Sequence, residues 1–136
     1  MALSDSDLAF EGLEDHLEEI RASDAHYITQ WDWSQLRNLR KINTIDIHLI
    51  SMYSIEQQFP SLESLQWLSI SKAEISFIHP KAFRGLTHLK MLILKENEIT
   101  EMSRKMLPNP AKELFLIDLR YLIDNFFSQY SNLSSF

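Results

Sequence analysis

The side chains best suited to acid–base or metal chemistry do not assemble into a recognisable site. The five histidines show neither an H-E-x-x-H pair nor another metal-ligand spacing, and each is better explained as a surface or turn residue: His16, His26, His48, His79 and His88. The serines lack the G-x-S-x-G turn that exposes a nucleophile, and the chain has no cysteine. The sequence therefore predicts no enzyme, no metal site and no cofactor.

A group of carboxylates near the start of the chain is the remaining candidate for a cation site. Glu14, Asp15, Glu18 and Glu19 lack the alternating spacing and the glycine of a calcium loop. They belong to an acidic segment, because residues 1–35 carry nine acidic side chains and one basic one, whereas the rest carries ten acidic and twelve basic. A solvated edge that repels nucleic acid and anionic lipid is the better interpretation.

Composition excludes further classes of protein. With 136 residues, of which 45% are hydrophobic and 24% charged, the chain has the size and make-up of one soluble domain. Two glycines cannot build a Gly-rich phosphate loop, and the absence of cysteine excludes a disulfide framework. No apolar run approaches the roughly 18 residues of a membrane helix, so we expect no membrane insertion.

The elements that position these residues are indicated by an internal repeat. The phrase Ala-Phe-Glu-Gly-Leu at 9–13 recurs as Ala-Phe-Arg-Gly-Leu at 82–86, which fits three periods of about 24 residues. Residues 86–99 match the pattern L-x-x-L-x-x-L-x-L-x-x-N-x-L in full, with Asn97 at the asparagine position. Looser copies begin at Leu13, Leu36, Leu62 and Leu114. An aromatic residue precedes the first leucine by three positions in four copies: Phe10, Trp33, Phe59 and Phe83.

Each position of the period has a physical reason. The L-x-L segment alternates with period two, so its leucines point to one face of a short strand and the x residues to the other. One repeat cannot bury its own leucines, so neighbouring repeats must supply the surface. The aromatic fills the convex side, and Gly85 supplies permissive backbone at the convex turn. Asn97 is expected to bond backbone groups where the chain leaves the strand, while the equivalent slots hold Ala25, Ile47, Ala73 and Leu122.

The repeats resemble those of leucine-rich repeat proteins over residues 10 to about 125. Residues 78–86 are similar to the I-x-x-x-A-F-x-G-L joint of the extracellular "typical" subfamily. Residues 10–20 resemble a phrase of secreted arthropod members, which include proteins named as the non-catalytic subunit of Oplophorus-luciferin 2-monooxygenase. The resemblance implies recognition of another protein without catalysis. It also implies an accessory, non-catalytic subunit of an enzyme complex as the alternative function.

We therefore predict an α/β solenoid: a short, curved, right-handed leucine-rich repeat coil of about five repeats, with a parallel sheet on the concave face and little helix. Strands are expected near 18–22, 41–45, 66–70, 90–94 and 115–119. Residues 1–136 form a single domain, in which 1–9 are an N-terminal edge, 10–125 the repeats and 126–136 a C-terminal cap or tail. An all-α protein with helical stripes would not explain the repeated phrase or the aromatics in phase.

The x positions around each strand leucine are predicted to form the binding surface. They make three columns across the sheet: Glu19, Lys41, Trp67, Met91 and Leu116; Arg21, Asn43, Ser69, Ile93 and Asp118; Ser23, Ile45, Ser71, Lys95 and Arg120. Several are too apolar for a wall exposed to water without purpose, and such anchors dominate interfaces. We expect a partner protein to contact Trp67, Ser69, Met91, Ile93, Lys95, Leu116, Asp118 and Arg120.

The ends of the chain leave two alternatives open. The apolar residues Tyr121, Leu122, Ile123, Phe126, Phe127 and Tyr130 fit either a short helix that caps the last strand or an exposed patch that self-associates. The start lacks a secretory signal, and the absence of cysteine fits a reducing compartment, whereas the resemblance implies an extracellular one. A fragment of a longer secreted chain would reconcile these signs, and Asn132 would then lie in a glycosylation sequon.

Overall fold

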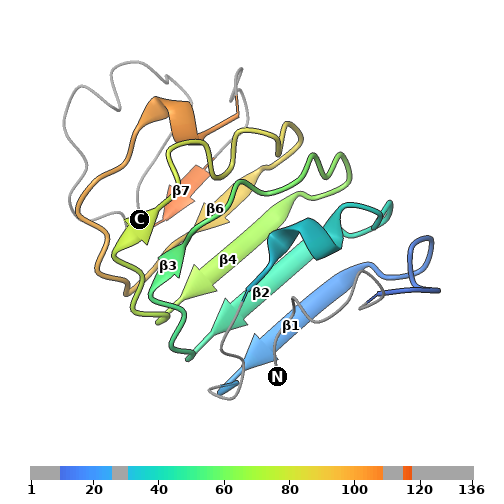
Figure 1. The fold of residues 1–136 in the computed structure, drawn as a ribbon, viewed down its shortest axis with the longest axis horizontal. Coiled ribbons are helices and arrows are strands. Elements are labelled where there is room, and N and C mark those ends of the chain that lie inside the picture. Colours follow the sequence, from blue (N-terminus) through green and yellow to red (C-terminus); the bar gives the residue numbers. More distant parts are fainter. Residues whose placement is uncertain (1–9, 26–30, 109–114, 118–136) are drawn as a thin grey trace.

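The core of the fold is a five-stranded parallel sheet whose strand order follows the chain. The computed structural model describes residues 10–25, 31–108 and 115–117. The strands are β1 (Glu19–Ser23), β2 (Thr44–His48), β4 (Trp67–Ser71), β6 (Met91–Ile93) and β7 (Phe115–Ile117), and Figure 1 shows them side by side. Every neighbouring pair is parallel, so each strand is followed by a return segment before the next one pairs with it. The predicted parallel sheet is confirmed.

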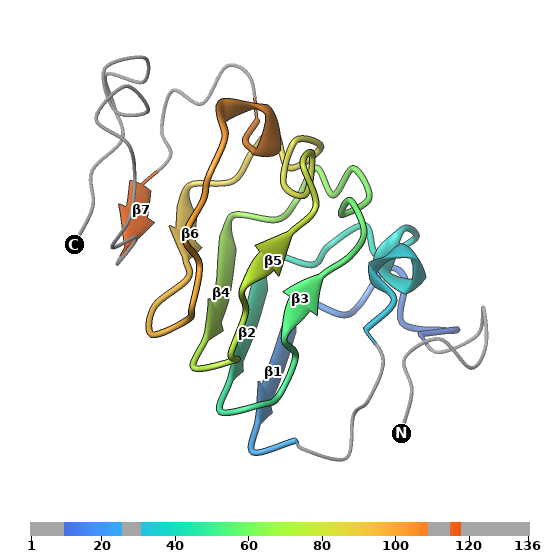
Figure 2. The ribbon, with the colours of Figure 1, turned by 60° about the vertical axis from the view of Figure 1, so that its left-hand side comes forward.

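The return segments form a second layer behind the sheet. They include a second parallel pair, β3 (Ser54–Ile55) with β5 (Phe77–Ile78), which lies apart from the main sheet in Figure 2. They also include two 3-10 helices, η1 (Trp33–Leu36) and η2 (Arg104–Met106). Within the described residues these two short elements are the only helices, in agreement with the expectation of little helix.

The core lies between the two layers and is built by the alternating strand residues. Ile45 and Ile47 of β2 are buried, as are Leu68 and Ile70 of β4. Leu92 of β6 continues the row. On β1, β2 and β6, the residues that alternate with the inward-facing ones are more exposed to solvent than they are. Removing such a side chain from water contributes about 1.5–3 kcal/mol. Because every row crosses several repeats, each repeat depends on its neighbours for this burial.

The second strand differs from the prediction by three residues. The leucine pattern predicts a strand at 41–45, whereas β2 spans Thr44–His48 and pairs Ile45 with Leu68. Leu36, used as the first leucine of this copy, instead ends the 3-10 helix η1. A pattern of apolar residues three apart matches almost as well when it is shifted by three positions. The other strands begin within one residue of the predicted positions, although β6 is shorter, and the predicted strand residues 118 and 119 lie outside the described residues.

The predicted convex aromatics form a stack through the second layer. The ring centroids of Trp33 and Phe59 lie 4.3 Å apart, and those of Phe59 and Phe83 lie 5.8 Å apart. Trp31 extends the stack, with its centroid 5.6 Å from that of Trp33. Phe10, the fourth predicted member, is partly buried against the core. Stacked and tilted ring pairs contribute about 0.5–1.5 kcal/mol each beyond the area that they bury.

Gly85 serves close packing rather than an unusual backbone angle. The repeat pattern predicts that Gly85 supplies permissive backbone, but among the described glycines only Gly12 has a positive φ, of +86°. A Cβ at Gly85 would lie 3.2 Å from the Ser61 Oγ and 3.5 Å from the Phe59 carbonyl oxygen. A side chain at this position would therefore require Ser61 of the third repeat to shift slightly, next to the aromatic stack.

Four residues just after the strands share a left-handed backbone. Asp24, Leu49, Lys72 and Glu96 have φ between 51° and 56°, although none is a glycine. This conformation turns the chain from the sheet into the return segment, and it costs a non-glycine residue about 1–2 kcal/mol. Backbone bonds across the repeats hold the turns in place, including Leu49 N–H to Ser71 O at 3.3 Å and Lys72 N–H to Lys95 O at 3.0 Å.

Asn97 ties the third and fourth repeats together behind these turns. Its Oδ1 accepts hydrogen bonds from the backbone N–H groups of Ala73 and Ile75, at 3.0 and 3.2 Å. Its Nδ2 donates to the carbonyl oxygens of Ile70 and Leu94, at 2.8 and 3.2 Å. The sheet register places Ala73, Ile50 and Ala25 at the equivalent slots, and all three are buried apolar residues. In the second repeat, the position equivalent to Asn97 is therefore Ile50 and not the predicted Ile47.

Replacement of Asn97 by alanine is expected to lower the free energy of unfolding by about 2–4 kcal/mol, because it leaves the Ala73 and Ile75 N–H groups without a partner. Urea denaturation of the purified chain measures this change. The matched control is Asn43→Ala, since the Asn43 side chain accepts only from the Thr44 hydroxyl among the described residues. If Asn97→Ala lowers the free energy of unfolding no more than Asn43→Ala does, Asn97 does not stabilise the contact between the repeats.

A second prediction concerns Glu74, an exposed residue with φ of 55°. Glu74→Gly is expected to raise the free energy of unfolding by up to about 1 kcal/mol, because relief of the left-handed conformation exceeds the entropy that glycine adds to the unfolded chain. The control is Glu63→Gly, which removes the same charge from an exposed turn and is expected to destabilise by roughly 0.5–1 kcal/mol. Equal urea midpoints for the two variants would refute the backbone argument.

Candidate partner-binding face

The side of the five-stranded sheet opposite the core carries three rows of side chains, which we call the open face. The register aligns Glu19, Thr44, Trp67 and Met91 in the first row and Arg21, Asp46, Ser69 and Ile93 in the second, while the third contains Ser23, His48 and Ser71. In the backbone register, Phe115 and Ile117 of β7 are the partners of Met91 and Ile93. The open face thus changes from charged residues on β1 and β2 to uncharged ones on β4 and β6, where the apolar side chains are Trp67, Met91 and Ile93.

The structure places the predicted binding residues in different settings. Trp67 begins β4 and is 41% exposed, whereas Met91 and Ile93 of β6 are half-buried. Lys95 follows β6 and is exposed, while Ser69 is only 6% exposed, with its Oγ 3.4 Å from that of Ser71. Leu116 lies in register with the core residue Leu92, and Phe115 holds the position beside Met91. Asp118 and Arg120 lie outside the described residues, as does the predicted cap at 126–136.

The shift of the second strand also changes which of its residues reach the open face. Lys41, Asn43 and Ile45 were expected in the three columns, but Ile45 is buried in the core. Thr44, Asp46 and His48 occupy the three rows instead. The signal that could have found them is the alternation of Ile45 and Ile47 with polar residues, because it fits a strand with one buried face.

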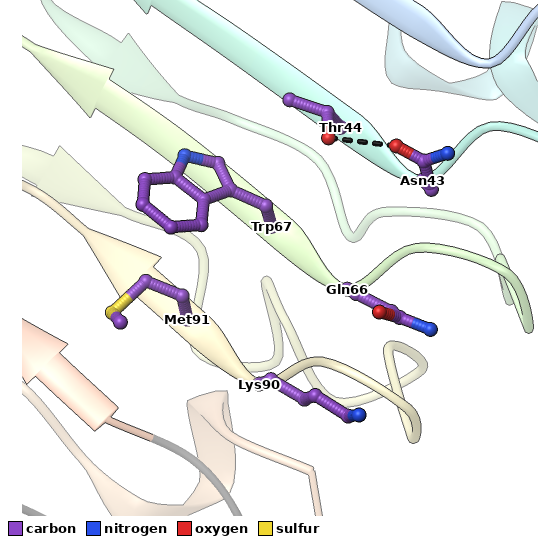
Figure 3. Close-up of a pocket in the computed structure, with 6 residues that line it drawn as sticks. All are labelled: Asn43, Thr44, Gln66, Trp67, Lys90 and Met91. Atoms are coloured by element: carbon purple, nitrogen blue, oxygen red, sulfur yellow. Dashed lines mark hydrogen bonds between the residues drawn. The ribbon is translucent and has the colours of Figure 1, made fainter.

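A hollow of about 380 Å³ opens at the start of the strands, where the apolar residues gather. It is lined by Asn43, Thr44, Gln66, Trp67, Lys90 and Met91 (Figure 3). In this view the Trp67 indole and the Met91 side chain lie next to each other over β4 and β6. Gln66 and Lys90 extend in a common direction from the starts of the same strands. The hollow thus has an apolar centre and a polar border.

Backbone bonds fix the residues of this border. The carbonyl oxygen of Asn43 accepts from the N–H groups of both Gln66 and Trp67, each at 3.0 Å. The Gln66 carbonyl oxygen accepts in the same way from Lys90 and Met91, at 2.9 and 3.0 Å. The positions of Asn43, Gln66 and Lys90 are therefore set by the sheet itself, and only their side chains are free to adapt to a ligand.

The charged half of the open face is largely neutralised by internal pairs. The Arg21 guanidinium donates to the Glu19 carboxylate at 3.0 Å and to Asp46 at 3.1 Å. The hydrogen bond to Glu19, with a smaller contribution from Asp46, raises the pKa of Arg21 above its usual value. His48 Nδ1 lies 3.9 Å from the other Asp46 oxygen. These groups form an exposed network in which the guanidinium is matched by two carboxylates.

Two of the four clustered carboxylates near the start of the chain are engaged in ion pairs. Glu19 binds Arg21, and Asp15 accepts two hydrogen bonds from the Arg40 guanidinium, at 2.6 and 2.8 Å. The bond from Arg40 holds the pKa of Asp15 below its usual value. Among the described residues, no group of three histidine, aspartate or glutamate side chains could hold a metal ion. Within the same residues, no helix has the length and apolarity to cross a membrane.

A comparison with known protein families finds a match over part of the chain. Residues 63–121 match the protein family described as "Leucine rich repeat". No curated protein matches the chain significantly. The family match includes Trp67, Met91 and the strands that carry them, and it supports a leucine-rich repeat protein with an α/β fold of the corresponding type. Such domains are generally non-catalytic modules for protein–protein interaction. Neither comparison supports the extracellular subfamily or the arthropod resemblance.

The geometry of β4 gives a stability test of the open face. Trp67→Ala is expected to change the free energy of unfolding by less than about 1 kcal/mol, because the side chain is partly exposed. Leu68→Ala, one residue further along the same strand, removes a fully buried side chain and is expected to cost about 2–5 kcal/mol. Urea denaturation compares the two. A large loss in the free energy of unfolding with Trp67→Ala would show that this side chain is part of the core instead.

Proposed function

We propose that this chain is a protein-recognition module, a short leucine-rich repeat solenoid of about five repeats that binds a partner on its open face, the predicted concave surface. The observation that carries this function is the pairing of Trp67 with Met91 over adjacent strands, at a hollow of about 380 Å³. A volume of this order is large enough for a side chain of another protein.

The distribution of side chains supports an interface rather than an ordinary solvated wall. Binding energy in protein interfaces concentrates on a few aromatic or long side chains near the centre, while the surrounding contacts exclude water. Trp67 and Met91 supply such a centre, and Asn43, Gln66 and Lys90 supply a polar border. The network of Glu19, Arg21 and Asp46 would then form the outer rim, where exposed ion pairs give specificity more than affinity.

The convex side carries exposed aromatics of its own and provides an internal control. Phe77 of β5 is 48% exposed, a fraction close to that of Trp67, but it belongs to the return segments. If a partner bound any exposed aromatic surface, replacing Phe77 would weaken binding as much as replacing Trp67. Recognition by the open face would depend on Trp67 alone.

The experiment selects binders from a displayed random-peptide library on the immobilised full chain and measures their affinity for variants. Trp67→Ala combined with Met91→Ala is expected to weaken most binders at least tenfold, the usual effect of removing central anchors, while the free energy of unfolding stays within about 1 kcal/mol. Phe77→Ala is expected to leave binding unchanged. Binders that lose affinity with Phe77→Ala but not with the double variant would refute the assignment of the open face.

The alternative function, an accessory subunit of an enzyme, is a prediction from the resemblance and would use the same face. Stoichiometric recovery of an enzyme with the tagged chain, lost with the Trp67→Ala and Met91→Ala variant, would favour it over binding of a non-enzymatic ligand protein.

A further inference from the structure

The charges around the hollow differ from those on the rest of the open face. Lys90 is the only charged residue among the six that line the hollow. It is exposed, and no described residue forms an ion pair with it. On β1 and β2, by contrast, the Arg21 cation is already matched by Glu19 and Asp46. As far as the described residues go, the hollow therefore presents an unpaired positive charge beside two apolar side chains.

The surroundings of Lys90 make its ammonium group available to a ligand. Lys90 precedes β6, and the residue at the same position before the neighbouring strand β4 is Gln66. The Gln66 side chain is neutral and extends in the same direction as that of Lys90 (Figure 3). The next position holds Asn43, also neutral. Backbone bonds to the Gln66 carbonyl oxygen fix the start of β6, so Lys90 stays at the border of the hollow while its flexible stem moves. A carboxylate arriving at this border meets a lysine and two amide side chains, all of which can donate hydrogen bonds.

The opposite edge of the sheet has the reverse character. There a second hollow of about 320 Å³ is lined by Asp24, Leu49, Ile50, Ser51, Lys72, Glu74, Glu96 and Glu98. Its single lysine, Lys72, lies 3.6 Å from a Glu96 oxygen and is thus paired. An anionic group is disfavoured at that edge and favoured at the edge of Lys90. Charge therefore distinguishes two hollows of similar size on one small domain.

From this arrangement, and resting on the proposed function, we propose that the partner is a protein segment with an acidic residue next to an apolar anchor. The anchor, aromatic or aliphatic, lies against Trp67 and Met91 in the hollow. The adjacent carboxylate pairs with Lys90 and accepts hydrogen bonds from the Gln66 or Asn43 amide. Charge complementarity of this kind selects among partners and accelerates their association, while the apolar contact supplies most of the affinity.

The test uses short synthetic peptides with a fixed leucine or tryptophan anchor, flanked by aspartate and glutamate, by glutamine and asparagine, or by lysine and arginine. Their affinities for the full chain are measured by fluorescence anisotropy at low and high salt. The acidic peptide is expected to bind about threefold to fivefold more tightly than the neutral one at low salt, as for an exposed ion pair, and the basic one more weakly. High salt should remove the difference.

Variants assign the effect to Lys90. Lys90→Gln is expected to abolish the preference, so that the acidic and the neutral peptide bind this variant with equal affinity. Lys81→Gln, which removes an exposed lysine from the convex turn, is the matched control and should retain the preference. Trp67→Ala is expected to weaken the acidic and neutral peptides alike by about tenfold. Thermal unfolding of each variant confirms that the chain is still folded.

The outcomes separate this inference from the function on which it rests. Equal affinity for acidic, neutral and basic peptides, all weakened by Trp67→Ala, would overturn the acidic partner and leave the open face as the binding site. If Trp67→Ala leaves the affinity of every peptide unchanged, both the acidic partner and the open face as the binding site are refuted. Tighter binding of an oligothymidylate, whose bases could stack on Trp67 and whose phosphates could pair with Lys90, would replace the protein segment by single-stranded nucleic acid. Failure of the acidic peptide to bind at all would also refute the proposal.

Discussion

The structure depends on one constraint: no repeat can bury its own apolar residues. A strand of three to five residues with a short return segment encloses too little volume, so Ile45 is buried only because Leu68 and Ile20 lie beside it in the sheet. The parallel backbone ladder fixes this side-by-side arrangement, and the inward rows then fill the space between the two layers. The same ladder also aligns the outward-facing residues of neighbouring strands. One strand register therefore determines both the core and the open face.

The repeats are not equally well connected, and the differences follow from single residues. Between the third and fourth repeats, the Asn97 side chain makes three hydrogen bonds, to Ala73, Ile75 and Ile70, and the absence of a side chain at Gly85 leaves room for Ser61. Between the first and second repeats the equivalent slots are alanine and isoleucine, and the links there include the exposed pair of Asp15 with Arg40. Trp67 and Met91 stand on the strands of the two repeats that Asn97 links. A rigid support of this kind reduces the ordering cost when a partner binds.

Much of the fold could be predicted from the sequence, because the repeat period and the strand alternation both arise from burial. The aromatic stack followed from three residues at one position of the period. The second strand was misplaced because Leu36, Leu39 and Ile42 satisfy the pattern, while the choice between two frames depends on packing that a single sequence does not contain. The hollow could not be predicted either. It requires Asn43, Gln66 and Lys90 to be brought together by the register, and these residues lie 23 and 24 positions apart in the chain.

The uniform register has a consequence for the way the chain folds. Register partners such as Glu19 and Thr44, or Trp67 and Met91, are separated by 23 to 25 residues in every pair of neighbouring strands. The entropy lost when such a loop closes depends on the logarithm of its length, so the steps differ by only about 0.1 kcal/mol. Chain length therefore favours no strand pair as the starting point, and the nucleus is selected by the strength of local packing. Local packing offers more than one such nucleus, because β2 pairs with β1 and with β4 over five residues each, while Asn97 adds side-chain bonds behind β4 and β6. Folding that starts at any of these pairs can then spread to the neighbouring repeats.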